Sequence, residues 1–81
     1  MNVTVLAFAR IREILGGGAH RMELAPGSTA RDLWRALAGR STAIDLLAAS
    51  TRIARNGRIV TLDEPLFDGD EIALLPPAGG G

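Results

Sequence analysis

Eighty-one residues, 47% of them apolar and 22% charged, predict one small globular domain with a modest core. Nine basic residues balance nine acidic ones, so no net field attracts nucleic acid or an acidic membrane, and neither is expected as a partner. The lack of Cys excludes a disulfide framework and a thiolate nucleophile, and because every basic residue is Arg, a P-loop lysine and a Schiff-base lysine are also excluded.

The first third of the chain predicts a strand, a short helix and a second strand. Residues 3–8 are β-branched and apolar, which is typical of a strand. Apolar residues at helical spacing then predict a short helix over 11–15, which three glycines at 16–18 end. Residues 20–24 form the next predicted strand, and the Pro26-Gly27 turn closes it.

The middle of the chain carries the strongest helix signal. Thr29 and Asp32 form a variant of the capping box, so a helix is expected to begin there and to end near Gly39. Its apolar stripe has the spacing of one helical face and comprises Ala30, Leu33, Trp34, Leu37 and Ala38. A second short helix is predicted over 42–49, with three residues buried: Ile44, Leu47 and Ala48.

The last third predicts strands and turns. Residues 52–55 and 58–62 flank Asn56-Gly57, a strong hairpin signal. A final strand over 72–75 is ended by Pro76-Pro77. This element order predicts an α+β domain over residues 1–75, with a mixed four- to five-stranded sheet that one main helix and short extra helices cover on one face. Residues 76–81 are expected to be a flexible C-terminal tail.

Internal residues offer little chemistry. His20 is alone, and the glycines at 16–18 follow a helix, whereas a phosphate cradle precedes one, so neither predicts a metal or phosphate site. The acidic residues of the last third are interpreted as solvated turns: Asp63, Glu64, Asp68, Asp70 and Glu71. Arg52, Arg55 and Arg58 lie near the hairpin, but without interleaved aromatics they indicate nucleic-acid binding only weakly. The chain is expected to have no catalytic apparatus and no metal site of its own.

The composition of the C-terminal tail predicts a function for it. Pro76 and Pro77 favour a stiff, extended exit from the last strand, and Gly79, Gly80 and Gly81 make a thread without side chains. Six residues beyond the strand reach about 20 Å at full extension, enough to enter the active site of another protein. The only chemical group of such a thread is its terminal carboxylate. A frayed terminus without function is the competing interpretation.

The sequence resembles the MoaD-type small subunits of molybdopterin synthase, which are sulfur carriers of the β-grasp, ubiquitin-like superfamily. The resemblance covers essentially the whole chain. It rests on residues 8–13 after the first strand, on Asn56-Gly57, and above all on residues 66–81, in which an acidic-glycine turn, a strand, Pro-Pro and a terminal Gly-Gly follow one another. The β-grasp fold alone would not indicate a function, because one fold serves many.

The resemblance implies a mechanism in which no cofactor is bound. An ATP-using, ubiquitin-activating-type enzyme adenylates the Gly81 carboxylate, and a sulfur donor converts it to a thiocarboxylate. The large subunit of the synthase then takes up the tail, and the sulfur enters the dithiolene of molybdopterin. The expected assembly is a heterotetramer with two large subunits. The lack of Lys is interpreted first as a GC-rich coding bias, and the alternative is an activated carboxyl end that meets no amine of its own.

A partner surface is expected on one face of the sheet. The helices are predicted to cover the face that carries Val3, Val5, Val60, Ile72 and Leu74. The opposite face then carries an exposed apolar patch of Leu6, Phe8, Ile59 and Leu75, at positions that the family uses for contacts, and Arg12 is expected to add a polar contact. Packing of these residues under the tail or under loops is the structural alternative.

The sequence also bears on the alternative functions and on the cellular location. A sulfur carrier or modifier for thiamine synthesis, tRNA thiolation or protein tagging is one alternative function, and a β-grasp binding module with an inert tail is another. No apolar run approaches the ~20 residues of a membrane span, and Met1 leads directly into a strand without a basic leader. A cytoplasmic protein is therefore the default expectation.

Overall fold

The computed structural model describes residues 1–77, so the predictions for Gly79, Gly80 and Gly81 lie outside the described residues. In chain order the elements are β1 (Asn2–Ala7), α1 (Ala9–Leu15), β2 (Ala19–Glu23), α2 (Ala30–Ala38), α3 (Thr42–Asp45), a 3₁₀ turn (Ala48–Ser50), β3 (Arg52–Arg55), β4 (Arg58–Val60) and β5 (Glu71–Leu75). Within residues 1–77, no helix has the length and apolarity that a membrane crossing requires.

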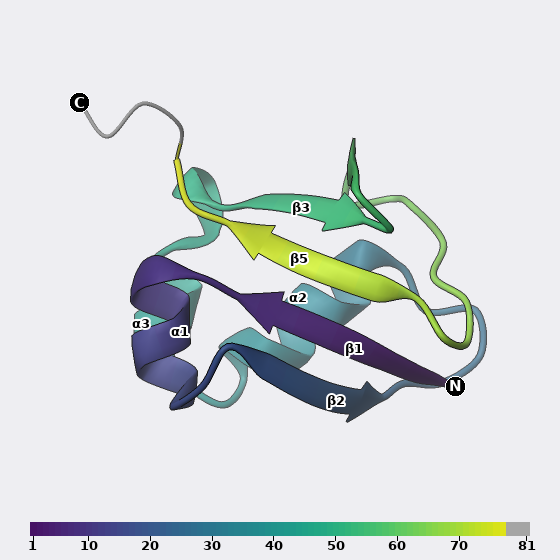
Figure 1. The fold of residues 1–81 in the computed structure, drawn as a ribbon, viewed down its shortest axis with the longest axis horizontal. Helices are drawn as coiled ribbons and strands as arrows, with labels where there is room; N and C mark the ends of the chain where they lie inside the picture. The colour runs from purple at the N-terminus through teal and green to yellow at the C-terminus, as the bar shows by residue number, and fades with distance from the viewer. Residues whose placement is uncertain (78–81) are drawn as a thin grey trace.

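The five strands form one mixed sheet in the order β2-β1-β5-β3-β4. The neighbours β1 and β5 are parallel, and the other pairs are antiparallel. The first and last strands of the chain therefore lie side by side at the middle of the sheet, and α2 and α3 lie behind one face of it (Figure 1). The α+β class and the β-grasp arrangement predicted from the sequence are confirmed.

The core lies between the sheet and α2. Alternate residues of β1 and β5 are buried, as strand geometry requires when one face is covered: Val3, Val5, Ala7, Ile72 and Leu74. They pack in one cluster with the apolar face of α2, where Leu33 and Leu37 are fully buried and Trp34 is 9% exposed. Val60 is partly buried against the same cluster. The predicted covered face and the predicted core position of Trp34 are confirmed.

Local chemistry explains where the principal elements begin and end. The Thr29 N–H donates to Asp32 Oδ2 at 2.8 Å, and the Asp32 N–H donates back to Thr29 Oγ1, which forms the predicted capping box at the start of α2. Asn56 and Gly57 have φ values of 50° and 86°, as the tight turn between β3 and β4 requires. Gly16 ends α1 in the left-handed conformation.

The helix predicted over 42–49 is wrong in its second half. α3 ends at Asp45, and a separate 3₁₀ turn follows at Ala48–Ser50. From Leu47 on, the backbone bonds have the tighter 3₁₀ spacing: the Leu47 N–H donates to the Ile44 carbonyl, and the Ser50 N–H donates to the Leu47 carbonyl, which also accepts from the hydroxyl groups of Ser50 and Thr51. As a result Ala48, predicted to be buried, is exposed, and Leu47 is only partly buried.

Candidate functional site

The sheet face that the helices leave open carries one apolar residue from every strand. Strand pairing aligns these residues, which we call the apolar row, from β2 to β4 as Ala19, Leu6, Ala73, Ala54 and Ile59. Residues paired in register project from the same face, so the row is continuous across the sheet. Ile59, at its β4 end, is 52% exposed. An apolar strip of this kind on an uncovered sheet is typical of a surface that binds a partner.

The two neighbouring rows differ in polarity. On one side, pairing aligns Arg21, Thr4 and Glu71, all of them exposed. On the other side, Leu75 is paired with Arg52, at the end of β5 from which the tail leaves. The apolar row therefore lies between a polar row and the base of the tail.

A groove of about 260 Å³, which we call the tail-base groove, lies beside the last residues of the described chain. Its lining is mostly apolar and comes from three separate segments: Phe8, Ala9, Arg10 and Ile11; Leu47 and Thr51; and Pro76 and Pro77. Phe8 is 42% exposed. Ala9 has a φ of 51°, a strained value for a residue with a Cβ, and the chain turns there from β1 into α1.

The structure brings together most, but not all, of the residues predicted for a partner surface. Leu6 and Ile59 lie in the apolar row, Leu75 lies one row nearer to the tail, and Phe8 lies in the tail-base groove with Pro76 and Pro77. Their role in binding stays a prediction, since no partner chain is present.

Arg12 lies apart from these residues. It lines a different cavity with Ala9, Glu13, Gly16 and Gly17, and its side chain lies against Gly18. Arg10 is the basic residue that lines the tail-base groove, and sequence reasoning missed it together with Leu47 and Thr51. The only sequence signal for Arg10 is its place two residues after Phe8, because the groove exists only once three distant segments are assembled.

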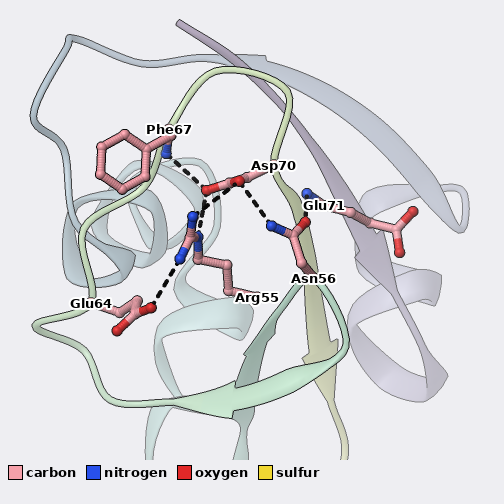
Figure 2. Close-up of polar contacts among 6 residues, drawn as sticks. All are labelled: Arg55, Asn56, Glu64, Phe67, Asp70 and Glu71. Carbon is pink, nitrogen blue, oxygen red and sulfur yellow. Dashed lines mark hydrogen bonds and ion pairs between the residues drawn. The ribbon is translucent and has the colours of Figure 1, made fainter.

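The interpretation of Asp70 as a solvated turn residue is wrong. Its carboxylate is 6% exposed and accepts hydrogen bonds from Arg55 Nε at 2.6 Å, Asn56 Nδ2 at 2.9 Å and the Phe67 N–H at 2.8 Å (Figure 2). Arg55 also pairs with Glu64, at 3.2 Å, and lies over the Phe67 ring. These contacts join the β3–β4 hairpin to the loop before β5, so Arg55 has a structural role here and does not stand ready for a phosphate.

The Asp70 carboxylate and the Arg55 guanidinium each stabilise the charged form of the other. Burial by itself raises the pKa of the Asp70 carboxyl, but hydrogen bonds from Arg55, Phe67 and Asn56 outweigh it, and the net pKa lies below the ordinary value of 3.8. The hydrogen bond to Asp70 likewise raises the pKa of the Arg55 guanidinium. Across residues 1–77, no three His, Cys, Asp or Glu side chains are grouped so that they could hold a metal ion.

Comparisons with known proteins agree with this architecture. Two molybdopterin synthase sulfur carrier subunits are similar over their full length: that of Chlamydomonas reinhardtii is 35% identical, with 100% of both chains covered, and that of Escherichia coli (strain K12) is 37% identical, with 98% of this chain and 99% of the relative covered. Small archaeal modifier protein 1 of Haloferax volcanii is 32% identical, with 91% and 94% covered.

Solved structures show the same fold. The crystal structure of the Haloferax volcanii SAMP1 protein superimposes with a TM-score of 0.86 at 28% identity, and all of both chains is covered. A chain in the complex of subunits 1 and 2 of the molybdopterin-converting factor from Helicobacter pylori gives a TM-score of 0.72 at 29% identity, again with full coverage of both. The sequence profile of the ThiS family matches residues 5–81. From this match and the full-length relatives, the chain belongs to the ThiS family.

Proposed function

We propose that this chain is the sulfur-carrying small subunit of a molybdopterin synthase and that it delivers sulfur as a thiocarboxylate on Gly81. The observation that carries the proposal is the full-length similarity to two sulfur carrier subunits of that synthase. The sheet supports it, because the apolar row on its open face includes Ala73 of β5, the strand that leads into the tail.

The proposed chemistry takes place in partner proteins. An ATP-using enzyme transfers AMP from ATP to the Gly81 carboxylate and releases pyrophosphate, which turns a poor electrophile into a reactive mixed anhydride. A donor of sulfide-level sulfur then attacks the Gly81 carbonyl carbon, AMP departs with its electron pair, and the thiocarboxylate remains. The large subunit accepts the tail and uses its sulfur for the dithiolene of molybdopterin. The chain contributes the reacting group and the surface that positions it.

Docking of the folded domain is needed because the tail alone binds weakly. Ordering residues 78–81 in a channel costs about 4–8 kcal/mol in backbone entropy. Burial of a fully exposed large apolar side chain contributes about 1.5–3 kcal/mol, and Phe8 and Ile59 are each about half exposed. No single residue offsets the cost, so the apolar row and the tail-base groove must be covered together.

The proposed partner of this surface is the large subunit. In the Helicobacter pylori complex, a chain similar to this one is associated with the other subunit of the converting factor. By the same resemblance we propose an assembly of two carriers with two large subunits, and a separate contact with the adenylating enzyme.

The intact mass of the chain tests the carrier chemistry. The chain with its native terminus is incubated with the activating enzyme of its host, ATP and a sulfur source. A shift that matches one oxygen-for-sulfur exchange, absent from a chain without Gly81, is the expected result. An unchanged mass would contradict the proposal, provided that the same activating enzyme loads another carrier with sulfur.

Protein modification is the second candidate function, and the similarity to small archaeal modifier protein 1 favours it. A modifier forms amide bonds between its last residue and amines of other proteins. Digestion of host proteins after expression of the chain separates the two candidates, since a modifier leaves its C-terminal residues attached to lysines and a carrier for molybdopterin does not.

A further inference from the structure

The side chains of this sequence offer no primary amine to its own activated end. All nine basic side chains are Arg, so the single primary amine of the 81 residues is the α-amino group of Met1. A guanidinium stays protonated at any physiological pH and does not attack an acyl group, whereas a lysine amine is deprotonated in part and does. Reaction with an amine would consume an activated carrier by forming a stable amide.

The amine of Met1 is itself engaged. It donates a hydrogen bond to the Leu24 carbonyl at 2.8 Å, and Met1 is partly buried against the core. This bond closes the start of the sheet, where β1 begins. A nucleophilic attack by this nitrogen requires loss of the hydrogen bond and of the proton that takes part in it.

Met1 also lies at the wrong end of the molecule. The N-terminus and the end of β5 are at opposite ends of the sheet (Figure 1). Ala7 is paired with Leu74, and Met1 precedes Ala7 by six residues, or about 20 Å of strand. Residues 78–81 reach at most about 14 Å beyond Pro77. The carboxyl end therefore cannot reach the amine of its own chain.

The basic side chains nearest to the tail are also arginines. Arg10 lines the tail-base groove with Pro76 and Pro77, and Arg52 is paired with Leu75. Both side chains lie within the reach of a four-residue thread. They give this region positive charge without placing an amine next to the reacting group.

We propose that the activated chain is an acyl donor that cannot be its own acceptor: it forms neither an internal lactam nor amide-linked polymers, and as a modifier it would add only as a single unit. The inference rests on the proposed function in that the Gly81 carboxyl must be activated. In the reaction that is avoided, an amine nitrogen attacks the Gly81 carbonyl carbon, a C–N bond forms, the leaving group departs with its electron pair, and the amine loses a proton to water.

A synthetic thioester tests this inference without any activating enzyme. The chain is prepared by intein cleavage with 2-mercaptoethanesulfonate, so that Gly81 carries a thioester, and it is incubated at mildly alkaline pH. Three chains are compared by intact mass: the wild type, Arg10→Lys at the tail-base groove, and Arg31→Lys as the matched control. Arg31 lies in the first turn of α2 and pairs with Asp63, which belongs to the segment that leads into the start of β5, whereas the tail leaves the other end of that strand.

The products differ by one water. We expect the wild type to yield the hydrolysed acid alone, Arg31→Lys to yield no lactam, and Arg10→Lys to yield mainly a monomer one water lighter, the lactam. A lighter monomer or a covalent dimer from the wild type would overturn the inference, because the Met1 amine would then be an acceptor. A lack of lactam from Arg10→Lys would overturn the role assigned to the tail base. Either outcome leaves the sulfur-exchange test unaffected, so the two proposals fail separately.

Discussion

Replacing Asp70 with Asn removes one charge from the interior without changing the shape of the side chain. In the wild type, Oδ2 accepts from Arg55 Nε and the Phe67 N–H, and Oδ1 accepts from Asn56 and, at 3.4 Å, from Arg55 Nη2. An amide has a single oxygen, so its NH₂ group meets two donors whichever way it turns. Asn56 cannot reverse without loss, because its own oxygen accepts from the Glu71 N–H.

The cost follows from these contacts. A hydrogen bond that involves a charged group contributes about 1.5–3 kcal/mol, and breaking a buried ion pair costs about 3–5 kcal/mol. We therefore expect Asp70→Asn to lower the free energy of unfolding by about 3 kcal/mol, a large part of the roughly 4–12 kcal/mol available to a domain of this size. The midpoint of thermal unfolding should fall by about 10–25 °C.

Equilibrium denaturation in urea measures this change. The control is Asp63→Asn, which breaks an ion pair with Arg31 whose side chains are 79% and 41% exposed, and should cost less than about 1 kcal/mol. If Asp70→Asn were as mild as this control, the buried carboxylate would not be what holds the hairpin to the loop, and the reasoning would be refuted.

Four further results are expected. The pKa of Asp70 in the folded protein lies below its unfolded value of 3.8, so its stabilisation is complete above that value and is lost as the pH falls further, through the lower folded pKa. The stability gap between the wild type and Asp70→Asn, measured in urea, should therefore narrow on acidification; a constant gap would contradict the lowered pKa. Trp34→Ala should cost about 3–5 kcal/mol, and an unchanged melting temperature would show that Trp34 is not a core residue. Phe8→Asp should leave the circular dichroism spectrum unchanged and should lower the affinity for the proposed large subunit, measured by calorimetric titration; unfolding would show that Phe8 supports the core. Gly80→Ala should fold normally but block sulfur loading, and a folded variant that loads fully, as judged by intact mass, would count against a narrow channel.

The parts of the fold that the sequence predicts are those set by neighbouring residues. The capping box of Thr29 and Asp32 and the Asn56-Gly57 turn each act within a few positions, so the bounds of α2 and of the hairpin follow directly from the sequence. The alternation of buried and exposed residues in β1 also reveals the open face, because a strand has a period of two.

The parts that it does not predict depend on residues brought together by the fold. The sequence predicts a turn residue at Asp70, and its ionic role emerges only when the pairing of β3 with β5 brings the side chain of Arg55, 15 positions earlier, within 2.6 Å of its carboxylate. Arg10 becomes part of a groove only when α1 meets the end of β5. From Leu47 on, the chain continues with 3₁₀ spacing and with two hydroxyl groups bonded to the Leu47 carbonyl, and the periodicity of apolar residues does not reveal this change.

The central position of β5 determines how the domain responds to force. A partner that draws on the tail pulls β5 along its own axis, and this strand is bonded to β1 on one side and to β3 on the other. The two ladders are loaded in shear, so their hydrogen bonds must fail together, whereas an edge strand peeled sideways loses them one by one. The sheet is therefore expected to stay folded when tension is applied to the tail.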